Sequence, residues 1–339
     1  MADMPVNVQG DLILAAEDYK RDRTVWLEAR RGGIGASEIS AILGLNHFNT
    51  PLDIWLSKTA TDTPSDDDMP EAAYWGLTNE HNVATTFAKR NPHLGKIHPT
   101  PGLLAVPGRP VLRATLDRLL VKRRVRPVEA VAAVECKTVG DFAYKNYWAD
   151  GLPPIHIQLQ TQWQMGVTGL DRVYVPHLVG GNWMPDAYVA ERDQSVIDEI
   201  FTYAEAWWED HIVGGKRPEV TFADMDKLSE LWPGNASLAS MKANAEMLGW
   251  IGKHLDAKRR EKEAVEDKLA AAFEIQKRMG DVEIIEDPSS SAKLVTWKMP
   301  KAGKMLDAKR LAEDHPEIYA EYLKDKNVSR TFVTKELIA

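Results

Sequence analysis

The chain lacks several features that define common classes of protein. It has one cysteine in 339 residues, which excludes an internal disulfide framework and a cysteine-only zinc or iron–sulfur centre within one chain. No apolar run approaches the roughly 18 residues of a membrane helix, and the first residues, MADMPVNVQGDLI, lack the basic-then-apolar pattern of a signal peptide. We therefore expect a soluble protein of a reducing compartment with no membrane partner.

Positive charge is also in short supply. The formal net charge of −8 argues against a protein that coats nucleic acid through its bulk charge, although it permits local basic patches such as residues 122–124. The nine histidines form no H-x-x-x-H or H-x-E…C-x-x-C pattern, so the common zinc hydrolase and deaminase motifs are absent. Carboxylates are abundant, and a site for a hard divalent cation is built from them.

The order of patterns predicts a mixed α/β domain over residues 1–215. A charged helical pattern over 11–29 leads into the glycine-rich loop RRGGIGASE, and residues 59–72 form a polar, acidic loop. Two strands joined by a basic turn are expected over 110–138. Helices are expected over 72–90, 141–150, 153–169 and 195–215, with strands near 172–181 and 187–193.

Residues 216–339 form a second predicted region, a helical and α+β extension. Residues 236–280 contain no proline, and a heptad interpretation places seven residues on one seam: Leu248, Ile251, Leu255, Val265, Leu269, Ala272 and Met279. Lys258 and Lys262 interrupt the seam, so a long helix packed on the core or on another subunit competes with a coiled coil. Strands near 282–285 and 293–298, a helix near 307–323 and a strand near 329–335 complete a small C-terminal unit.

The stretch VAAVECKTVG, residues 131–140, ends an apolar run in charged residues. On a strand, Glu135 and Lys137 point to one face and Cys136 to the other. With Asp117 on the neighbouring strand, two carboxylates would meet beside a lysine. One or two Mg²⁺ ions could then clamp a phosphodiester and supply hydroxide, with the Cys136 carbonyl as a further ligand. Lys137 could orient or deprotonate the attacking water. The alternative is a surface salt bridge at a strand end, because short motifs of this kind often arise by chance.

Five segments occur in one order: WLEARRGGIGASE, YWGLTNEHNV, ATLDRLL, VECKT and IQLQTQWQMGVTG. Together they resemble the YqaJ-like viral recombinases, the lambda-exonuclease-type branch of the PD-(D/E)xK nucleases, over about residues 24–215. The resemblance implies a restriction-endonuclease-like core, a central mixed sheet flanked by helices with the metal centre at one end.

The resemblance also assigns roles to single residues. Asp117 sits at the family's metal aspartate, Glu135 and Lys137 sit at its E-x-K pair, and Glu80 matches a helix glutamate that completes the acidic centre. Gln160 matches a glutamine near the scissile phosphate, with Gln162 as the alternative register. For the 5′-phosphate of a DNA end, the resemblance implies three further residues: Arg30, Ser37 and Thr115.

Each of these residues also has an ordinary structural interpretation, and the sequence departs from the family's pattern at two places. Glu80 and Arg30 could be solvated charges, Gln160 could link helices, and Ser37 could cap the helix that follows it. The family's Pro-Asp-Gly turn reads Leu116–Asp117–Arg118 here. A second arginine, which some relatives place after the E-x-K strand, is missing here: Ala143 falls near its position, and Lys145 is the candidate substitute.

The function that the resemblance implies is a Mg²⁺-dependent (or Mn²⁺-dependent) exonuclease. It would degrade linear double-stranded DNA from 5′ to 3′ and leave a 3′ overhang for a phage single-strand annealing protein. A ring-shaped trimer and a location in the cytoplasm of a bacterial host are further implications, for a gene of phage or prophage origin. The alternatives are a structure- or sequence-specific endonuclease of the same fold and a catalytically silent DNA-binding module.

Overall fold

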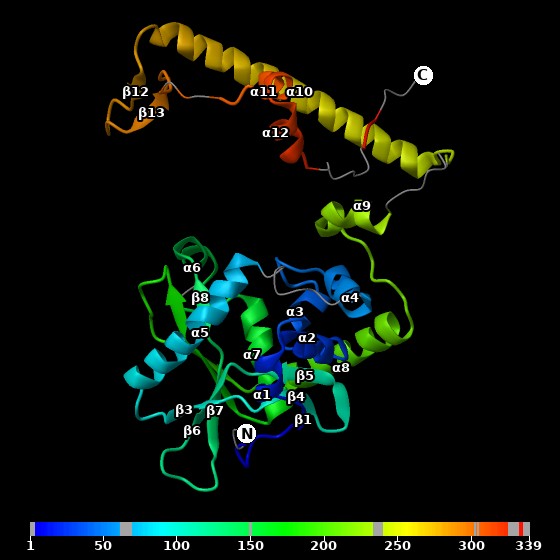
Figure 1. Ribbon diagram of the computed structural model, residues 1–339, viewed down its shortest axis with the longest axis vertical. Helices are drawn as coiled ribbons and strands as arrows, with labels where there is room; N and C mark the ends of the chain where they lie inside the picture. The colour runs from blue at the N-terminus through cyan, green and yellow to red at the C-terminus, as the bar shows by residue number, and fades with distance from the viewer. Residues whose placement is uncertain are drawn as a thin grey trace. The chain divides into compact units, whose positions relative to one another are not determined.

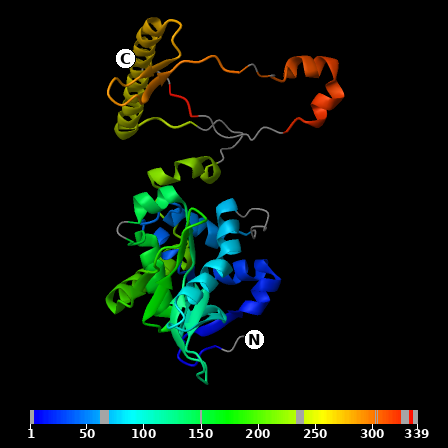
Figure 2. The same cartoon turned by 90° about the vertical axis from the view of Figure 1, so that its left-hand side faces the viewer.

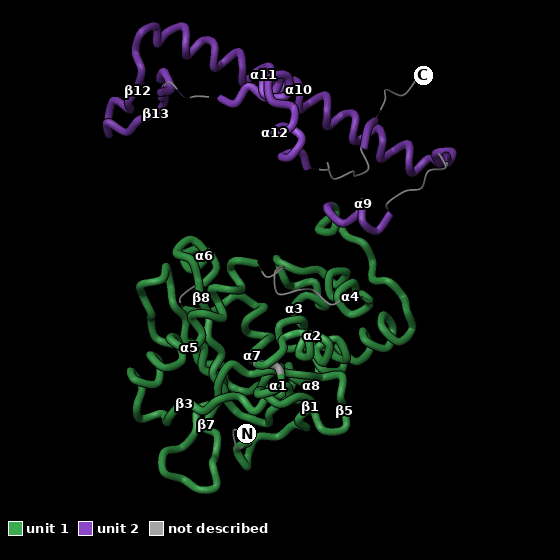
Figure 3. The backbone as a smooth tube through the Cα atoms, viewed as in Figure 1, with its two compact units in different colours: residues 1–225 green, residues 226–339 purple. Residues whose placement is uncertain are grey.

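The computed structural model describes residues 4–61, 70–148, 151–232, 240–301, 303, 305–324 and 332–334 (Figure 1). Most of the acidic loop expected over 59–72 and most of the strand expected near 329–335 lie outside these residues. The chain divides into two compact units, residues 1–225 and 226–339, which are coloured separately in Figure 3. No helix in the described ranges is long and apolar enough to span a membrane.

Two main sheets form the framework of the first unit. A four-stranded sheet has the order β1-β4-β5-β2, and a five-stranded sheet has the order β11-β9-β7-β6-β3. A further pair, β8 and β10, is parallel, as are β7 with β9 and β2 with β5, whereas the other pairs are antiparallel. The fold is therefore mixed α/β. Its strands are β1 (Asp11–Ala15), β2 (Ile34–Gly35), β3 (Lys96–Pro99), β4 (Gly102–Val106), β5 (Arg109–Thr115), β6 (Arg118–Val121), β7 (Ala130–Val134), β8 (Lys137–Val139), β9 (Arg172–Val175), β10 (His177–Val179) and β11 (Tyr188–Glu191).

Helices cover both faces of the five-stranded sheet, as Figures 1 and 2 show. On one face, Phe87 of α5 packs against Leu120 and Val134. On the other, Trp163 of α7 joins Leu119 and other buried residues in the larger core cluster. The helices of this unit are α1 (Ala16–Arg21), α2 (Arg23–Arg31), α3 (Ile39–Ile42), α4 (Pro51–Thr59), α5 (Glu71–Arg90), α6 (Asp141–Tyr147), α7 (Ile155–Thr168) and α8 (Gln194–Trp208), which a π-helical turn (Glu209–Val213) extends.

Alternation along β6 and β7 decides which side chains face which helix. Leu119 and Ala133 belong to the core cluster shared with α7, whereas Leu120 and Val134 belong to the cluster shared with α5. Successive residues of a strand point to opposite faces. The polar residues at the strand ends are therefore directed either toward α7 or toward α5.

The helix expected over 11–29 is wrong at its beginning. Residues 11–15 form β1, with Asp11 opposite Ala105 of β4, and helix begins only at Ala16. A break at Asp22 then separates α1 from α2, where the Asp22 side chain caps α2 through the N–H of Thr24. Pairing with a strand some ninety residues away overrides the local helical pattern, because propensity is a weak prior against tertiary contacts.

Residues 216–225 are attached to the rest of the first unit through a buried carboxylate. Asp224 accepts a hydrogen bond from Thr50 Oγ1 (2.5 Å), at the start of α4, and another from the N–H of Thr221 (2.8 Å). The compact unit thus extends past residue 215, where we expected its boundary. Asp224 has no exposed surface, so its hydrogen bonds hold this segment against the rest of the unit.

The second unit is built around a single long helix. Along this helix, α10, Met279 is the one residue that is buried. Of the other six seam residues, Ile251, Leu255 and Ala272 are half-buried, whereas Leu248, Val265 and Leu269 are exposed. Packing of α10 on another subunit stays a prediction. The elements of the second unit are α9 (Leu228–Leu231), α10 (Ala245–Met279), β12 (Ile284–Glu286), β13 (Lys293–Thr296), α11 (Ala308–Asp314) and α12 (Pro316–Glu321).

Candidate active site

Two breaks in neighbouring strands bring the acidic side chains together. Asp117 lies between β5 and β6 rather than within one strand, and Glu135 lies between β7 and β8. Because β6 and β7 pair with Arg118 opposite Val134, the two breaks are adjacent. The Asp117 carboxylate accepts a hydrogen bond from the N–H of Cys136, with 2.7 Å between Oδ2 and N.

Glu135 is the centre of a buried hydrogen-bond network on the α7 side of the sheet. Its Oε1 accepts from Lys137 Nζ and from Gln160 Nε2, each at 2.7 Å, and its Oε2 accepts from Gln164 Nε2 at 2.7 Å. Lys137 Nζ also donates to Gln160 Oε1 at 2.9 Å. The structure thus brings Glu135, Lys137 and Gln160 together. Gln162 instead contacts Glu191 and the residue-193 backbone, away from this network.

Gln164 was missed by the sequence analysis. It lies one helical turn after Gln160 on α7 and is buried. Residues four apart on a helix share a face, so the spacing within QLQTQWQ was an available signal. Its amide holds the second oxygen of Glu135, which fixes the orientation of the carboxylate.

Glu80 faces the same centre from the opposite side of the sheet, through Arg118. The Arg118 guanidinium forms an ion pair with the Glu80 carboxylate, and both side chains are about one-fifth exposed, at 20% and 19%. Arg118 occupies the position where the family's turn carries glycine. Arg118 and Leu120 are two residues apart on β6 and therefore point to the same face of the sheet. Leu120 packs on α5, the helix that carries Glu80, so Arg118 is directed toward Glu80.

The electrostatic field of this cluster is strongly negative around Asp117. Burial, together with the charges of Glu135 and Glu80, raises the pKa of Asp117 well above its usual range. Burial works to lower the pKa of Lys137, but Glu135 and Asp117 outweigh it and leave that pKa above its ordinary value. Lys137 is therefore a cation at neutral pH, whereas ionisation of Asp117 is opposed by its neighbours.

The donor set suits a hard divalent cation, although the side chains are not gathered as a ready-made site. Within the described ranges, no group of three or more His, Cys, Asp or Glu residues is arranged to hold a metal ion. Asp117, Glu135 and Glu80 are held instead by protein hydrogen-bond donors. Carboxylate oxygens are the ligands that Mg²⁺ prefers, and a cation would relieve the repulsion that raises the pKa of Asp117. Cys136 contacts Asp117 through its N–H, and coordination by its carbonyl stays a prediction.

A second group of residues is cationic and hydroxyl-bearing. Arg30, in the last turn of α2, donates from Nη2 to Ser37 Oγ at 2.8 Å. The Trp26 ring lies under the Arg30 guanidinium, 5.2 Å from its carbon to the ring centroid, and the indole N–H donates to Thr115 Oγ1 at 3.4 Å. Arg30, Ser37 and Thr115 are thus linked through Trp26. Ser37 does not cap α3, whose N-cap position is Glu38.

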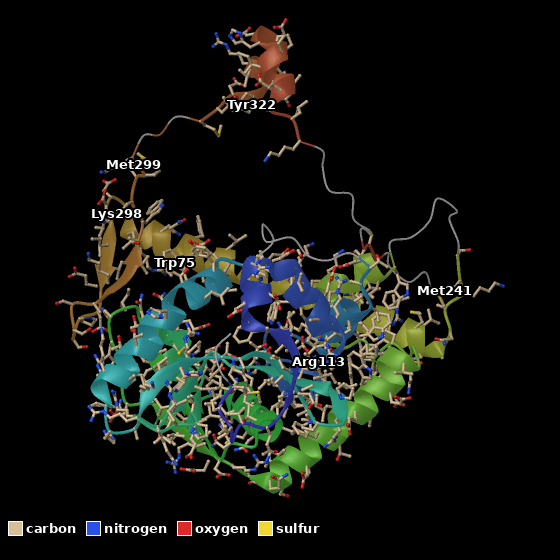
Figure 4. All side chains as sticks on the ribbon, turned by 60° about the horizontal axis from the view of Figure 1, so that its bottom comes forward. Trp75, Arg113, Met241, Lys298, Met299 and Tyr322 are labelled. Atoms are coloured by element: carbon tan, nitrogen blue, oxygen red, sulfur yellow. The ribbon has the colours of Figure 1, made fainter. Side chains whose placement is uncertain are left out.

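Arg113 explains the two consecutive glycines of RRGGIGASE. Its guanidinium donates to the carbonyl of Ala29, on α2, and lies against the loop, as Figure 4 shows beside the dark-blue segment. A Cβ at Gly32 would lie 2.8 Å from Arg113 Nη1, and one at Gly33 would lie 2.5 Å from the Val111 carbonyl oxygen. Side chains larger than hydrogen would push the loop away from β5, so the glycines set the position of Arg30.

One cavity of about 580 Å³ joins the two groups. Its cationic wall includes Arg23, Arg30 and Arg113, and its acidic wall includes Glu80 and Asp117. Glu135 and Lys137 connect to this cavity through Gln160, which lines it. Lys145, the suggested substitute for a second arginine, lies on α6 and is not among the lining residues. Trp75, on the first half of α5 in Figure 4, is half exposed.

The fold and the cavity together define an α/β protein whose site sets cations and carboxylates face to face. Residues 25–171 match the family model of the YqaJ-like viral recombinase domain, so this part of the chain is similar to that family. All residues to which the resemblance assigns a role lie within this range.

Two kinds of relative accompany the family match. The uncharacterized protein YqaJ of Bacillus subtilis (strain 168) is 29% identical over 326 residues, which cover 95% of this chain and 97% of that protein. The similarity thus includes the second unit. Among solved structures, an alkaline exonuclease from Laribacter hongkongensis matches with 19% identity and a TM-score of 0.44, over 55% of this chain and 91% of that chain. The same exonuclease in complex with dAMP matches with 17% identity and a TM-score of 0.46, over 61% of this chain and 97% of that chain.

Proposed function

We propose that this protein is a metal-dependent deoxyribonuclease with a PD-(D/E)xK core. Its substrate would be the end of linear double-stranded DNA, degraded from 5′ to 3′ to leave a 3′ overhang. The observation that carries the proposal is the cavity in which Arg30 and its partners face Asp117 and Glu80. Cleavage at a DNA end needs both groups. Cations bind the terminal phosphate, and carboxylates beside the neighbouring phosphodiester hold the metal ion at the bond to be cut.

The acidic group would hold the divalent ion, Mg²⁺ or Mn²⁺, through three side chains: Asp117, Glu135 and Glu80. When bound, such an ion activates water and offsets the charge of the phosphate. Protonated Lys137 stabilises the negative charge that develops on the phosphate oxygens. Gln160 forms hydrogen bonds with both Lys137 and Glu135 and so holds the ammonium in place. It also forms a hydrogen bond with the attacking water, as donor or as acceptor. This assignment gives Lys137 an electrostatic role, because its pKa is raised.

The cationic group would receive the 5′-phosphate. Arg30 supplies the charge, and hydroxyls accompany it at Ser37 and Thr115. Arginine forms paired hydrogen bonds to phosphate oxygens, which fixes the direction of the chain as well as its end. Binding the 5′ end beside the acidic centre accounts for cleavage from that end.

The wider biological setting follows the family resemblance. We propose that the enzyme assembles as a ring-shaped trimer around DNA and passes its 3′ overhang to a phage single-strand annealing protein. It would act in the cytoplasm of a bacterial host, encoded by a phage or prophage, in homologous recombination.

A digestion assay tests the reaction. Linear duplexes labelled at the 5′ or the 3′ end, and closed circular DNA, are incubated with Mg²⁺ or with chelator. The variants are Lys137→Ala and Asp117→Ala, and Lys89→Ala, at an exposed position near the end of α5, is the matched control. Early release of the 5′ label from linear DNA alone, lost with chelator and in the first two variants, is the expected result.

Other outcomes would change the proposal in defined ways. Cutting of closed circles would indicate an endonuclease of the same fold. DNA binding without cleavage under either metal would refute the enzyme and leave a DNA-binding module.

A further inference from the structure

A buried carboxylate lies directly behind Arg30. Glu38 is 6% exposed, and its Oε1 is 3.0 Å from Arg30 Nη2. Its Oε2 is 2.8 Å from Lys58 Nζ and accepts a hydrogen bond from the N–H of Gly35, also at 2.8 Å. Three donors on three segments of the chain thus converge on one side chain, which does not itself line the cavity.

Lys58 completes the arrangement from α4. Its side chain is 2% exposed, and its ammonium donates to the carbonyl oxygen of Arg30 at 3.0 Å. Arg30 is therefore held at its backbone by Lys58 and at its guanidinium by Glu38. Both side chains border Gly35, where a Cβ would lie in ordinary contact, 3.5 Å from Arg30 Nε and from Glu38 Oε2.

The charges of this group do not cancel. Two cations, Arg30 and Lys58, share one carboxylate, so one positive charge is left over where Arg30 reaches the cavity. A buried ion pair is tolerated when further hydrogen bonds satisfy its members, and here both carboxylate oxygens of Glu38 have donors. The surplus charge has an anion as its natural counterpart, and Arg30 is the member that is partly exposed, at 29%.

We propose that Glu38 is a positioning residue for recognition of a terminal phosphate. It holds the Arg30 guanidinium in the orientation that meets the phosphate and makes binding depend on the phosphorylation of the DNA end. This inference rests on the proposed function and adds to it a residue that touches neither DNA nor the acidic centre.

The physical reason lies in the number of acceptors. A glutamine at position 38 has one amide oxygen in place of two carboxylate oxygens, so it cannot accept from Arg30, Lys58 and the Gly35 N–H together. Its amide N–H₂ would also face a cation. Arg30 then loses its anchor, although the local charge becomes more positive. The two explanations therefore predict opposite effects of Glu38→Gln. Loss of the Arg30 anchor would weaken phosphate binding, whereas the added positive charge alone would strengthen it.

The test measures binding without cleavage. Fluorescence anisotropy of the full-length protein, with Ca²⁺ in place of Mg²⁺, gives dissociation constants for duplexes that carry either a 5′-phosphate or a 5′-hydroxyl. For Glu38→Gln we expect the preference for the phosphate to fall about tenfold, the effect of a lost charge-assisted hydrogen bond, with affinity for the 5′-hydroxyl duplex unchanged. Glu205→Gln, which breaks the Arg109–Glu205 ion pair outside the cavity, should keep the wild-type preference.

A double variant separates position from charge and protects against loss of folding. Glu38→Gln combined with Lys58→Met removes the unpaired buried lysine and restores one net positive charge. Its melting temperature should recover, while the phosphate preference stays low. Recovery of the preference would overturn the inference, because the loss in Glu38→Gln would then come from the unpaired buried Lys58 and not from the missing anchor of Arg30. An unchanged preference in Glu38→Gln, or equal weakening for both duplexes, would overturn it as well.

The outcome is distinguishable from failure of the proposed function. If the wild type digests linear DNA but Glu38→Gln retains its preference, only the positioning role is wrong. If the wild type fails to digest any DNA, the nuclease assignment is wrong whatever the binding data show. If the wild type does not distinguish the two ends, the terminal-phosphate pocket and the role of Glu38 are both refuted.

Discussion

Replacement of Asp117 by asparagine is expected to stabilise the metal-free protein while it abolishes DNA hydrolysis. Burial and the charges of Glu135 and Glu80 raise the pKa of Asp117 above its unfolded value of 3.8. Between the two pKa values the folded state binds more protons than the unfolded state. Stability therefore falls as pH rises through that window. Asparagine removes this titration, and its amide oxygen can still accept from the N–H of Cys136.

The size of the effect can be bounded from this environment. Relief of unfavourable functional-site interactions commonly stabilises a protein by about 0.5–2 kcal/mol. One kcal/mol shifts the melting temperature of a unit of this size by about 2–4 °C. In chelator, Asp117→Asn should thus melt about 1–8 °C above the wild type at neutral pH. The gap should close toward acidic pH, where the wild-type carboxyl is itself protonated.

Thermal melting across a pH series, with chelator or with Mg²⁺, provides the measurement. Mg²⁺ should raise the melting temperature of the wild type, because a bound cation relieves the repulsion around Asp117, and should do so weakly in the variant. Asp171→Asn, at an exposed position, is the control and should behave as the wild type. A variant that melts below the wild type at every pH in chelator would refute the reasoning, since the carboxylate would then be a net stabilising group.

Three further predictions concern the same cavity. Lys137→Met should lower the single-turnover cleavage rate by about 10²–10³-fold with DNA affinity in Ca²⁺ nearly unchanged; a rate near that of the wild type would exclude the electrostatic role. Gly33→Ala should destabilise by about 1–3 kcal/mol in urea denaturation, because its Cβ would lie 2.5 Å from the Val111 carbonyl oxygen; unchanged stability would mean that the loop yields. Arg118→Gly should tighten Mn²⁺ binding in calorimetry, because Glu80 loses its ion-pair partner; equal affinity would show that the pair does not compete with the metal.

Elements with a strong local pattern were predictable from the sequence. The helix α7 begins directly after two prolines, and its N-cap is Pro154, as the preference of proline for helix starts indicates. The apolar run before Glu135 predicted a buried strand, and β7 is one. By contrast, the local pattern of residues 11–15 predicts helix, because the partner that makes them a strand, β4, lies far along the chain. Nothing within residues 11–15 records that partner.

The residues behind the site escaped prediction for a related reason. Glu38 and Lys58 lie on different segments, and each alone resembles an ordinary solvated charge, which is the usual state of these residue types. Only the fold places α4 beside the loop that follows β2, so that one carboxylate meets both cations. Gln164 was accessible in principle through its spacing from Gln160. A buried role for glutamine, however, depends on Glu135, which another element supplies.

The overall charge of the chain and the charge of its cavity have opposite consequences for DNA binding. A net charge of −8 repels a polyanion at distances within which salt does not screen it. The cavity wall nevertheless carries four arginines against two carboxylates: Arg23, Arg30, Arg113, Arg118, Glu80 and Asp117. The cavity therefore attracts a phosphate that comes within hydrogen-bonding distance, whereas the overall charge opposes binding along the duplex. Such a distribution favours a protein that engages a DNA end over one that adheres along the duplex. Binding measured with the linear duplex should accordingly weaken steeply when the end is blocked by a hairpin, and a hairpin-capped duplex that binds as tightly would show that the cavity is not what the DNA enters.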